Sequence, residues 1–513
     1  MPWGGVTWHE AEYRDVVQMS DVVLVNPGEP ERVFQGLARA GLTAIEPPPW
    51  CRLIASHLRK HRISVAIVDA EAMQLTPWDA AKTAGYLNPR LVAVVVHGSQ
   101  PSASTQKMPA ASATVQSLKA NQPHVPVILV GGHPAALSVM SLKESGADYV
   151  CTGEGPIAIR DLLGRGGYLA LGIVDRYAQW NPPAPNITDL ANEMPGGCWD
   201  MLPMGLYRSY AHHAWSNDFQ RTPYASIYTS LGCPFSCSFC MIQSPFREGD
   251  KLMLKGKANS YRTWPASSVI AEIEELVERY NVTNIRINDE MFVLQPKHLD
   301  SICDTIKERY GDRLNLWCYG RCDQTKERFL EKMRSAGFKW LCLGIESVSD
   351  QVRDGVAKGE YGRDEIIDTV KRIKDHGINI IANYLFGLPD DDDDSMIDTL
   401  DLALELKTEY VNFYSVVAFP GSKLWDDKIK EGWKPPDNWL AWSFHSYEHV
   451  PLGTKHLSPA EVLQFRDYAF NTYYNDPSYR AYVLGKFGER AIKEIDFMLS
   501  HELKRKLLED KAA

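Results

Sequence analysis

Short β-branched runs alternate with helix-length segments along most of the chain, and this alternation limits the fold to a few α/β architectures. In the first series the runs cover residues 22–26, 65–69, 91–96, 125–131 and 148–153. Near-continuous apolar strands separated by amphipathic segments indicate a parallel sheet covered on both faces. We therefore predict a doubly wound, Rossmann-like α/β domain over residues 21–165, preceded by an N-terminal extension at residues 1–20.

A second series of the same kind begins near residue 223. Its predicted strands cover residues 225–230, 284–289, 314–319, 339–345, 379–387 and 410–417, with helix-length segments between them. Six successive β/α units predict a partial (β/α)6 barrel of the TIM type over residues 223–430, with its functional groups at the carboxyl ends of the strands.

The remaining segments differ from both series. Residues 166–222 lack periodicity and are rich in proline, which is typical of a linker packed over neighbouring domains. Residues 431–513 are predicted to form a helical C-terminal domain. Ser458 and Glu461 there form a capping box, with a proline between them at the first helical position. The helix that follows is predicted to point Val462, Phe465, Tyr468 and Ala469 inward.

Three cysteines, Cys233, Cys237 and Cys240, occur within eight residues in the sequence CPFSCSFC. Iron–sulfur clusters are normally held by four cysteine thiolates, so a three-cysteine loop leaves one iron with an open position. A zinc site would require a fourth protein ligand, and no nearby histidine or cysteine pair supplies one. Without a metal, the loop would hold three buried free cysteines.

Composition limits the protein's surroundings. The chain of 513 residues has a net charge of −10, which argues against nucleic acid or an anionic membrane as the main partner. Its first residues lack the pattern of a signal peptide, and no apolar run approaches membrane-spanning length. Ten cysteines in so long a chain fit reduced thiols better than a disulfide framework. We expect a soluble cytoplasmic protein without a membrane span.

The carboxyl ends of the first series of strands carry the candidate ligand-binding residues. Ligands of such sheets bind beyond these ends, where glycine lets a ligand approach the backbone and polar groups suit a nucleotide-like cofactor. The absence of G-x-G-x-x-G after the first strand weighs against NAD. The candidates are Asn26, His97, Gly98, Ser99, Ser102, Gly131, Gly132, His133, Gly153, Glu154 and Gly155.

CPFSCSFC resembles the signature loop of the radical S-adenosylmethionine (SAM) enzymes, C-x3-C-x-aromatic-C, with Phe239 as the aromatic residue. The resemblance implies a 4Fe–4S cluster on the three cysteines and a SAM molecule chelated by the open iron. One electron from the cluster then cleaves SAM to a 5′-deoxyadenosyl radical. An external one-electron reductant of the flavodoxin or ferredoxin type is implied as well.

The same resemblance assigns SAM contacts at the ends of the second series of strands. Asn288, Asp289 and Glu290 replace the family's Gly-Gly-Glu, so Glu290 or Asp289 is expected to accept hydrogen bonds from the SAM ammonium group. A solvated acidic loop is the alternative. Arg321 is expected to pair with the SAM carboxylate. Glu346 and Ser347, in a GIES element, are implied near the ribose and Asn383 near the adenine.

The first domain, placed directly before such a loop, resembles the cobalamin-binding domain of cobalamin-dependent radical SAM enzymes. The sequences VNP, VPVILVGGHP and GEG match its turns. The D-x-H-x-x-G motif is absent, so the resemblance implies cobalamin bound without a histidine as lower ligand. His97 and His133 either contact the corrin or its nucleotide tail, or are turn histidines bonded to the backbone.

Two further patterns favour structural interpretations. Cys318 and Cys322 repeat the C-x3-C spacing, but a third thiolate is missing, so we interpret them as barrel cysteines. The acidic run at residues 390–394 directly precedes a predicted helix. Acidic residues at a helix N-terminus complement the helix dipole, and this favours capping over a metal site.

The resemblance implies a C-methyltransferase that acts on an unactivated carbon of a small molecule, with a 4Fe–4S cluster, SAM and cobalamin as cofactors. One alternative is a cyclase or ring-rearranging enzyme that uses cobalamin without methyl transfer. Another is a non-catalytic cobalamin-binding carrier or sensor. The sequence identifies neither a catalytic acid or base nor the substrate, because one fold serves many reactions.

Overall fold

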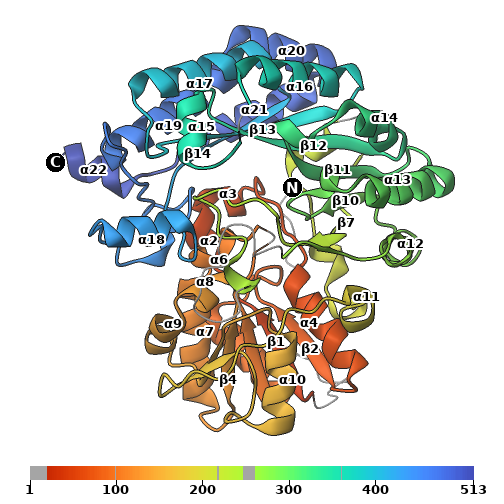
Figure 1. Cartoon of the computed structure of the whole chain (residues 1–513), viewed down its shortest axis with the longest axis vertical. Coiled ribbons are helices and arrows are strands. Elements are labelled where there is room, and N and C mark those ends of the chain that lie inside the picture. Colours follow the sequence, from red (N-terminus) through yellow and green to blue (C-terminus); the bar gives the residue numbers. More distant parts are fainter. Residues whose placement is uncertain (1–19, 99, 216–218, 247–259, 360, 513) are drawn as a thin grey trace.

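The computed structural model describes residues 20–98, 100–215, 219–246, 260–359 and 361–512. Two α/β units lie one above the other in Figure 1, the N-terminal unit below and the barrel-like unit above. The predicted N-terminal extension, apart from Ser20, lies outside the described residues. In the described part of the chain, no helix combines the length and the apolar character needed to cross a bilayer.

The lower unit is built on a six-stranded sheet in the order β2-β1-β3-β4-β5-β6. Its strands are β1 (Val22–Asn26), β2 (Val65–Asp69), β3 (Leu91–Val95), β4 (Val127–Val130), β5 (Tyr149–Cys151) and β6 (Ile173–Asp175). The first five are parallel and confirm the predicted doubly wound fold, whereas β6, from the segment expected to be a linker, pairs antiparallel with β5. The strand order reverses between β1 and β3, which is where such sheets bind ligands.

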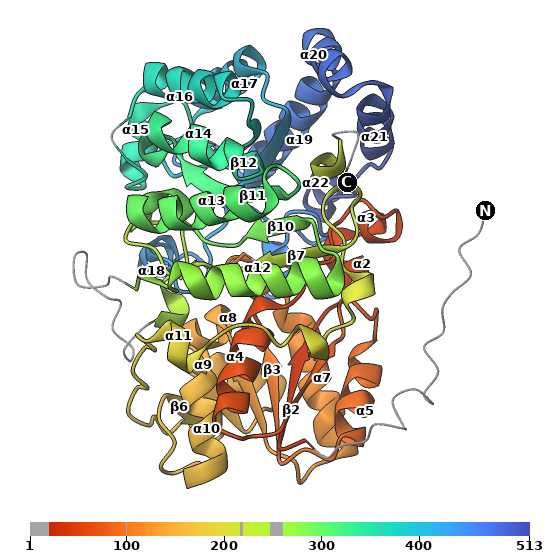
Figure 2. The ribbon, with the colours of Figure 1, turned by 90° about the vertical axis from the view of Figure 1, so that its right-hand side faces the viewer.

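Helices cover both faces of this sheet, as Figure 2 shows. Helices α4 and α10 pack on one face, and α5, α7 and α9 pack on the other. Their bounds are α4 (Pro49–Lys60), α5 (Pro77–Tyr86), α7 (Met108–Asn121), α9 (Ser138–Ser145) and α10 (Pro156–Arg165). Short helices follow the strand ends: α2 (Pro30–Phe34), α3 (Gly36–Arg39), α6 (Ala103–Gln106) and α8 (Gly132–Ala136).

The upper unit holds the second six-stranded sheet, in the order β14-β13-β12-β11-β10-β7. Its strands are β7 (Tyr224–Ile227), β10 (Asn284–Ile287), β11 (Asn315–Arg321), β12 (Phe338–Glu346), β13 (Asn379–Phe386) and β14 (Tyr410–Ser415). All are parallel, and β7 and β14 do not pair with each other. This arrangement confirms the predicted partial barrel and leaves it open along one side.

Helices follow these strands as expected for successive β/α units. They are α12 (Ala266–Tyr280), α13 (Pro296–Tyr310), α14 (Glu327–Ser335), α15 (Asp350–Gly355), α16 (Arg363–Asp375) and α17 (Asp393–Leu406). Asp392 caps α17, accepting a hydrogen bond from the backbone N–H of Ser395. The acidic run before this helix therefore has the capping role that its position predicted.

The open edge of the barrel at β14 is covered by side chains of the C-terminal helices. The hydroxyls of Tyr473, Tyr474 and Tyr479 donate to the backbone carbonyls of Thr408, Val411 and Glu409 at 2.7, 2.7 and 3.0 Å. An edge strand otherwise leaves such groups unpaired. These helices are α19 (Pro459–Asn475), α20 (Pro477–Phe487), α21 (Glu489–Leu499) and α22 (Lys506–Ala512), after α18 (Lys423–Lys430).

The predicted capping box opens α19, with Ser458 and Glu461 bonded to each other's backbone N–H. Val462 and Ala469 are fully buried and Phe465 is half-buried, as expected. The prediction for Tyr468 is wrong, because 58% of this residue is exposed. It lies one residue before Ala469, on the edge of the helix face that packs against the barrel.

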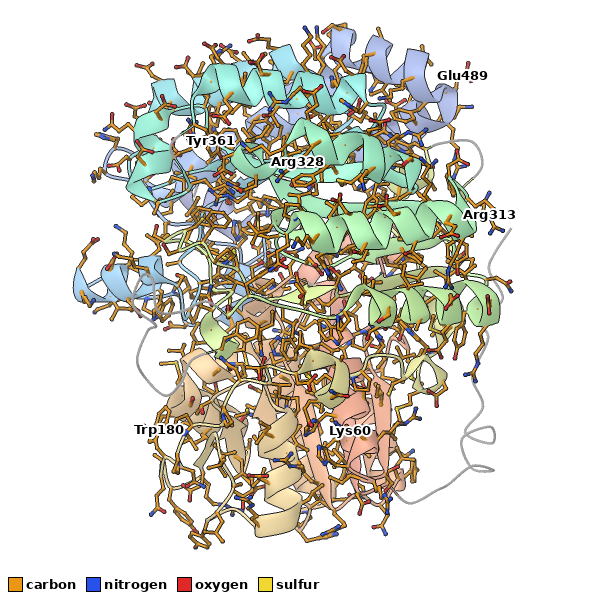
Figure 3. All side chains as sticks on the ribbon, turned by 45° about the vertical axis from the view of Figure 1, so that its right-hand side comes forward. Lys60, Trp180, Arg313, Arg328, Tyr361 and Glu489 are labelled. Carbon is orange, nitrogen blue, oxygen red and sulfur yellow. The ribbon has the colours of Figure 1, made fainter. Side chains whose placement is uncertain are left out.

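In the part of the chain that the structure describes, three ion pairs join the two units, whose side chains meet along the boundary (Figure 3). Arg52 of α4 bonds Glu272 of α12 at 2.6 Å. Glu46 bonds Arg286 of β10, and Glu154 bonds Arg262, both also at 2.6 Å. Each of the six side chains is at most 12% exposed. Buried pairs of this kind fix the register of two surfaces, because a displaced partner would leave a buried charge uncompensated.

Candidate functional site

The cysteine loop follows β7 and the two-residue strand β8 (Ser230–Leu231), which pairs with β9 (Arg262–Thr263). Gly232 starts the loop with φ of +81°, and a Cβ there would overlap Ser260. The side chain of Gln243 donates to the Cys233 carbonyl at 2.5 Å and accepts from Ser260 at 2.6 Å. The loop is thus folded back on itself by its own polar groups.

The arrangement of the three thiols does not match that around a single zinc ion. Cys233 is buried, and Cys237 and Cys240 are half-buried. Among the described residues, these sulfurs do not form a set that lies mutually within 4.8 Å. Tetrahedral zinc, with Zn–S bonds of about 2.3 Å, would hold its thiolates within about 4 Å of one another. Burial raises the pKa of Cys233 to about 12, so a thiolate there needs a bound cation.

Arg321, at the end of β11, supports this loop. Its Nη1 lies 3.4 Å from Cys237 Sγ, and its guanidinium lies 4.0 Å from the ring centre of Phe235. It also pairs with Asp323 at 3.0 Å and donates to the Lys358 carbonyl. The contact with a SAM carboxylate stays a prediction, and it would require one of these bonds to be exchanged.

Asp289 and Glu290, at the end of β10, have different surroundings. Asp289 is fully buried and accepts from the backbone N–H of Thr229 at 2.6 Å and from the hydroxyls of Thr229 and Ser230. Its carboxylate therefore fixes the segment that leads into the cysteine loop. Glu290 Oε1 is buried without a hydrogen-bond partner among the described residues, and burial raises the Glu290 pKa to about 7. Of the two, Glu290 has an oxygen free for a ligand.

The other predicted SAM residues lie at or near strand ends in the same unit. Glu346 forms an ion pair with Lys358, and Ser347 contacts Thr399. Asn383 donates to Cys342 Sγ and accepts from Asn412 at 3.0 Å. Phe239 is half-buried and packs against the apolar cluster that includes Met241, Val352 and Val356. Asn288, which was not singled out as a ligand, is fully buried with neither amide atom bonded in the described chain.

On the cobalamin-domain side, the turns after β3 and β4 lie together. Gly131 has φ of +154°, and a Cβ there would overlap the carbonyl of Val96. Ser104, a residue that the sequence did not suggest, donates to that carbonyl and accepts from the His133 backbone N–H at 3.0 Å. The two turns are therefore held in close backbone contact, which a side chain at position 131 would not allow.

The two predicted histidines differ in position. His97 stacks on Trp50 with ring centres 4.6 Å apart, and its Nε2 has no partner in the described chain. His133 is fully buried, with its ring edge against Trp439 at 4.4 Å. Burial lowers the pKa of each to about 3, so both imidazoles are neutral. Of these two histidines, His97 lines a small cavity between the two units, described below, and His133 does not.

Most of the remaining predicted cobalamin residues have structural partners or positions at the domain boundary. Asn26 donates to Asp69 at 2.7 Å and accepts from Lys107 at 2.8 Å. Glu154 is held by Arg262 and by the backbone N–H of Ile187. Gly153 lies near Pro245, Gly155 precedes α10 with φ of +108°, and Ser102 precedes α6. Ser99 lies outside the described residues.

The strand ends of both units meet at one small space of about 20 Å³, which we call the interdomain cavity. His97, Gly98 and Gly132 line it from the lower unit, and Tyr228, Ser230 and Glu290 line it from the upper unit. Gly132 also contacts the cysteine loop directly: its carbonyl accepts from Ser244 at 2.6 Å, and an added Cβ would lie 2.9 Å from Met241. The cysteine loop and the predicted cobalamin turns are therefore immediate neighbours.

Trp50, Tyr228 and Phe246 also line this cavity, and the sequence did not suggest them. Trp50 comes from the start of α4, Tyr228 follows β7, and Phe246 follows the cysteine loop. None belongs to a sequence motif. Position directly after a strand was the one clue available for Tyr228.

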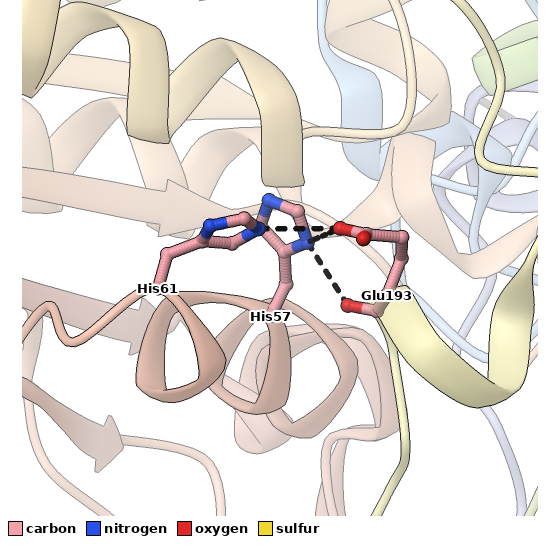
Figure 4. Close-up of side chains that lie close together, drawn as sticks. All are labelled: His57, His61 and Glu193. Carbon is pink, nitrogen blue, oxygen red and sulfur yellow. Dashed lines mark hydrogen bonds and ion pairs between the residues drawn. The ribbon is translucent and has the colours of Figure 1, made fainter.

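A separate group of possible metal ligands lies on the lower unit, where Figure 4 shows His57, His61 and Glu193. His57 Nδ1 lies 2.9 Å from the Glu193 carbonyl, and His61 Nε2 lies 3.2 Å from Glu193 Oε2. Lys60, labelled in Figure 3, occupies the other carboxylate oxygen at 3.0 Å. These bonds join α4 to α11 (Leu190–Glu193), and the lysine on the same carboxylate disfavours a cation there.

Comparison with known proteins agrees with this geometry. The Radical SAM superfamily model matches residues 227–403, and the B12 binding domain model matches residues 37–163. An uncharacterised methyltransferase of Pyrococcus horikoshii is 26% identical over 439 residues, which cover 84% of this chain and 88% of the relative.

Two solved structures share the fold across both units. TsrM from Kitasatospora setae, a radical SAM methyltransferase with tryptophan and a SAM analogue bound, matches with a TM-score of 0.64 and 16% identity over 93% of this chain and 99% of its own. OxsB, a cobalamin-dependent radical SAM enzyme with aqua-cobalamin and SAM bound, matches with a TM-score of 0.67 and 14% identity over 96% of this chain and 75% of its own.

The radical SAM domain implies a 4Fe–4S cluster and SAM, and the B12-binding domain implies cobalamin. The residues present fit these groups: three thiols in one loop, an unpartnered buried carboxylate beside them, and a glycine turn facing both. With a B12-binding domain followed by a radical SAM domain, the chain is a cobalamin-dependent radical SAM enzyme.

Proposed function

We propose that this enzyme is a C-methyltransferase that acts on an unactivated carbon of a small molecule. The observation that carries the proposal is the interdomain cavity, where Glu290, beside the cysteine loop, and Gly132, at the predicted cobalamin turn, line one space. Similarity over 84% of the chain to a P. horikoshii methyltransferase supports the same conclusion.

The proposal assigns each group of residues a task. Cys233, Cys237 and Cys240 hold the cluster, and Glu290 accepts hydrogen bonds from the SAM ammonium group. Asp289 positions Thr229 and Ser230 ahead of the loop. When bound, the cluster and SAM supply a 5′-deoxyadenosyl radical, and cobalamin supplies the methyl group. An electron donor of the flavodoxin or ferredoxin type completes the system.

The lower unit holds its cofactor through backbone approach. Gly98 and Gly132 bring bare backbone of the turns after β3 and β4 to the cavity, beside the His97 ring. Trp50 and Phe246 add apolar side chains to the wall of the same space, and a larger ligand seated there would be shielded from water by them. Exclusion of water protects reactive intermediates from side reactions, and fixed positions are the protein's main contribution in cofactor chemistry.

The test uses anaerobically reconstituted enzyme with cobalamin, SAM and a one-electron reductant. Formation of both S-adenosylhomocysteine and 5′-deoxyadenosine supports methyl transfer, with comparable amounts expected once substrate is present. Formation of 5′-deoxyadenosine alone indicates a cyclase or ring-rearranging enzyme instead. Formation of neither, in protein that holds iron and cobalamin, indicates a carrier or sensor. A Cys237→Ala variant is the matched control and should form no 5′-deoxyadenosine.

A further inference from the structure

A second, larger cavity of about 500 Å³ lies inside the open barrel. Ligand pockets typically span about 300–1,000 Å³. Its walls include Arg286 of β10, Trp317 of β11, Cys342 of β12, Ile381 of β13 and Asn412 of β14. We call this space the barrel cavity. The five strands contribute side chains to it, so it occupies the concave side of the sheet.

Other segments close the barrel cavity. Phe34 of α2 comes from the lower unit, Tyr210 and Trp215 flank a 3-10 turn at residues 211–214, and Phe470 and Ile495 come from α19 and α21. The cavity therefore lies between the barrel, the cobalamin-binding unit and the C-terminal helices. Segments from these three parts of the chain must be assembled before it exists.

None of the residues predicted to hold SAM, the cluster or cobalamin lines the barrel cavity. It nevertheless reaches towards both cofactor regions. Gln100, in the loop after β3, lines it, while Gly98 and Pro101 of the same loop line the interdomain cavity. Arg286 lines it four residues before Glu290. A third ligand placed here would lie beside the cofactors without displacing the residues assigned to them.

The end of the barrel cavity near the 3-10 turn is aromatic. His212 stacks on Tyr410 with ring centres 4.0 Å apart, and Trp215 lies 5.9 Å from Tyr410. Tyr210 in turn stacks on His212 at 5.8 Å. Rings held together in this way present flat apolar faces, which bind other rings by stacking and edge contacts.

The charged side chains of this cavity are compensated by protein partners. Arg286 bonds Glu46, Arg466 bonds Asp467 at 2.7 Å, and Glu494 accepts from the Trp215 indole at 2.7 Å. Glu502 is exposed at the surface. Burial lowers the pKa of His212 and of His445 to about 3, so neither imidazole carries a charge at neutral pH. Apart from His501 and Glu502, the described lining residues offer no free counter-charge to a buried charge on a ligand, and burying such a charge is costly.

Hydrogen-bonding groups without partners face the same region. His212 Nε2 is buried and unbonded in the described chain. No bond from the described residues reaches the hydroxyl of Tyr414, which lines the cavity. Polar uncharged groups on a ligand would satisfy these atoms, as in sites where a few polar groups orient a mainly apolar ligand.

From these observations we infer that the barrel cavity binds the substrate, and that the buried part of this substrate is an uncharged ring system with hydrogen-bonding substituents. The inference rests on the proposed function only in calling the ligand the substrate. Rings are favoured by the aromatic wall, neutrality by the compensated charges, and polar substituents by His212 and Tyr414.

The inference is tested by equilibrium dialysis of the holoenzyme, loaded with cluster and cobalamin, against two dyes with related ring systems. Nile red is neutral, and resorufin is an anion. One Nile red should bind per chain, with resorufin weaker by at least about tenfold because its charge would be buried. Equal or tighter binding of resorufin would overturn the assignment of a neutral ligand. If Nile red binds protein without cobalamin but not protein loaded with it, the barrel cavity is the cobalamin site, and its assignment to the substrate is overturned.

Variants locate the dye. Ile381→Trp fills the cavity from β13 and should weaken Nile red binding at least about tenfold, whereas Ile397→Trp, at a position 45% exposed on α17, should not. Phe470→Ala is a milder change and should weaken binding about tenfold through lost ring contact, with Tyr468→Ala on the same helix as its control. Unchanged binding in both cavity variants, with cobalamin retained, would overturn the inference.

SAM cleavage is measured on the same preparations. If Nile red binds as expected but neither SAM product forms, the proposed function fails and the ligand class is upheld. If both products form while the cavity variants leave dye binding unchanged, the inference fails and the proposed function stands.

Discussion

Both carboxylate oxygens of Glu46 accept from the same nitrogen of Arg286, at 2.6 and 2.7 Å. Glu46 belongs to the cobalamin-binding unit and Arg286 to the second strand of the barrel, where its Nη2 also bonds the Tyr319 hydroxyl at 2.9 Å. The arginine side chain is 2% exposed. This pair therefore fixes the cobalamin-binding unit to the wall of the barrel cavity.

Replacing Glu46 by alanine should lower the free energy of unfolding by about 3–5 kcal/mol, because a buried guanidinium is left without its partner. Glu29→Ala removes a pair with Arg32, in which the arginine side chain is 48% exposed, and should cost less than about 1 kcal/mol. Denaturant unfolding followed by tryptophan fluorescence compares the two variants. Equal, small effects would contradict a locking role for Glu46.

Gly131→Ala should lower cobalamin affinity by roughly tenfold or more, because the new methyl group meets the Val96 carbonyl and the backbone conformation favours glycine. Gly164→Ala is the control, since a methyl group at that position in α10 meets nothing within 4 Å. Cobalamin binding is followed by its visible absorbance. Retention of full affinity in Gly131→Ala would show that this turn does not shape the cobalamin site.

Glu290 should make stability depend on pH. Burial raises its pKa from an ordinary value near 4.5 to about 7, so the folded protein binds the proton more tightly than the unfolded chain. The stability contributed by the protonated form is fully present below about pH 4.5 and is lost as the pH rises through about 7. The size of this loss is on the order of 3 kcal/mol.

Glu290→Gln removes this titration. In cofactor-free protein, the natural chain should lose stability between pH 5 and pH 8, whereas the variant should not lose this part of it. The difference in unfolding free energy, variant minus natural chain, should therefore rise over this range by an amount that approaches the loss on the order of 3 kcal/mol. Glu278→Gln, at an exposed position of α12, should follow the natural chain at both pH values. Parallel pH profiles for Glu290→Gln and the natural chain would show that this carboxylate does not titrate in the cavity.

Measurement of bound iron distinguishes the cysteine loop from the second C-x3-C pair, Cys318 and Cys322. Cys237→Ala should remove most cluster iron and its broad visible absorbance, because two thiolates cannot hold a four-iron cluster. The double change Cys318→Ala and Cys322→Ala should leave both unchanged, since both residues are buried in the barrel wall. Iron loss in that double variant, with the fold intact by circular dichroism, would overturn the structural interpretation of these two cysteines.

Much of the fold follows from the sequence because most strand residues are apolar and buried. The five strands β1–β5 and the six barrel strands lie where the apolar runs predict them. Strand β6 escaped prediction because it has three residues in a proline-rich segment and pairs antiparallel. The tyrosine bonds along β14 could not be foreseen, since they join hydroxyls to carbonyls about 60–70 residues away in the chain.

The sequence predicted which segments form the site, but not the contacts that each side chain makes there. Asp289 and Glu290 are adjacent in sequence, yet the fold turns one carboxylate into a hydrogen-bonded support and leaves the other with a free oxygen. His97 and His133 both follow glycine-bearing strand ends, and packing alone places His97 at the cavity and His133 against Trp439. Sequence gives residue types and spacing, whereas these differences depend on tertiary packing.

The most direct test of the central claim is the electron paramagnetic resonance spectrum of enzyme that contains both the reduced cluster and cob(II)alamin. If the two cofactors bind on the two sides of the interdomain cavity, their spins interact, and the cob(II)alamin signal should broaden and relax faster than in a variant with Cys233, Cys237 and Cys240 all changed to alanine. Identical cob(II)alamin spectra and relaxation rates in both proteins, at full cofactor loading of the natural chain, would contradict the account.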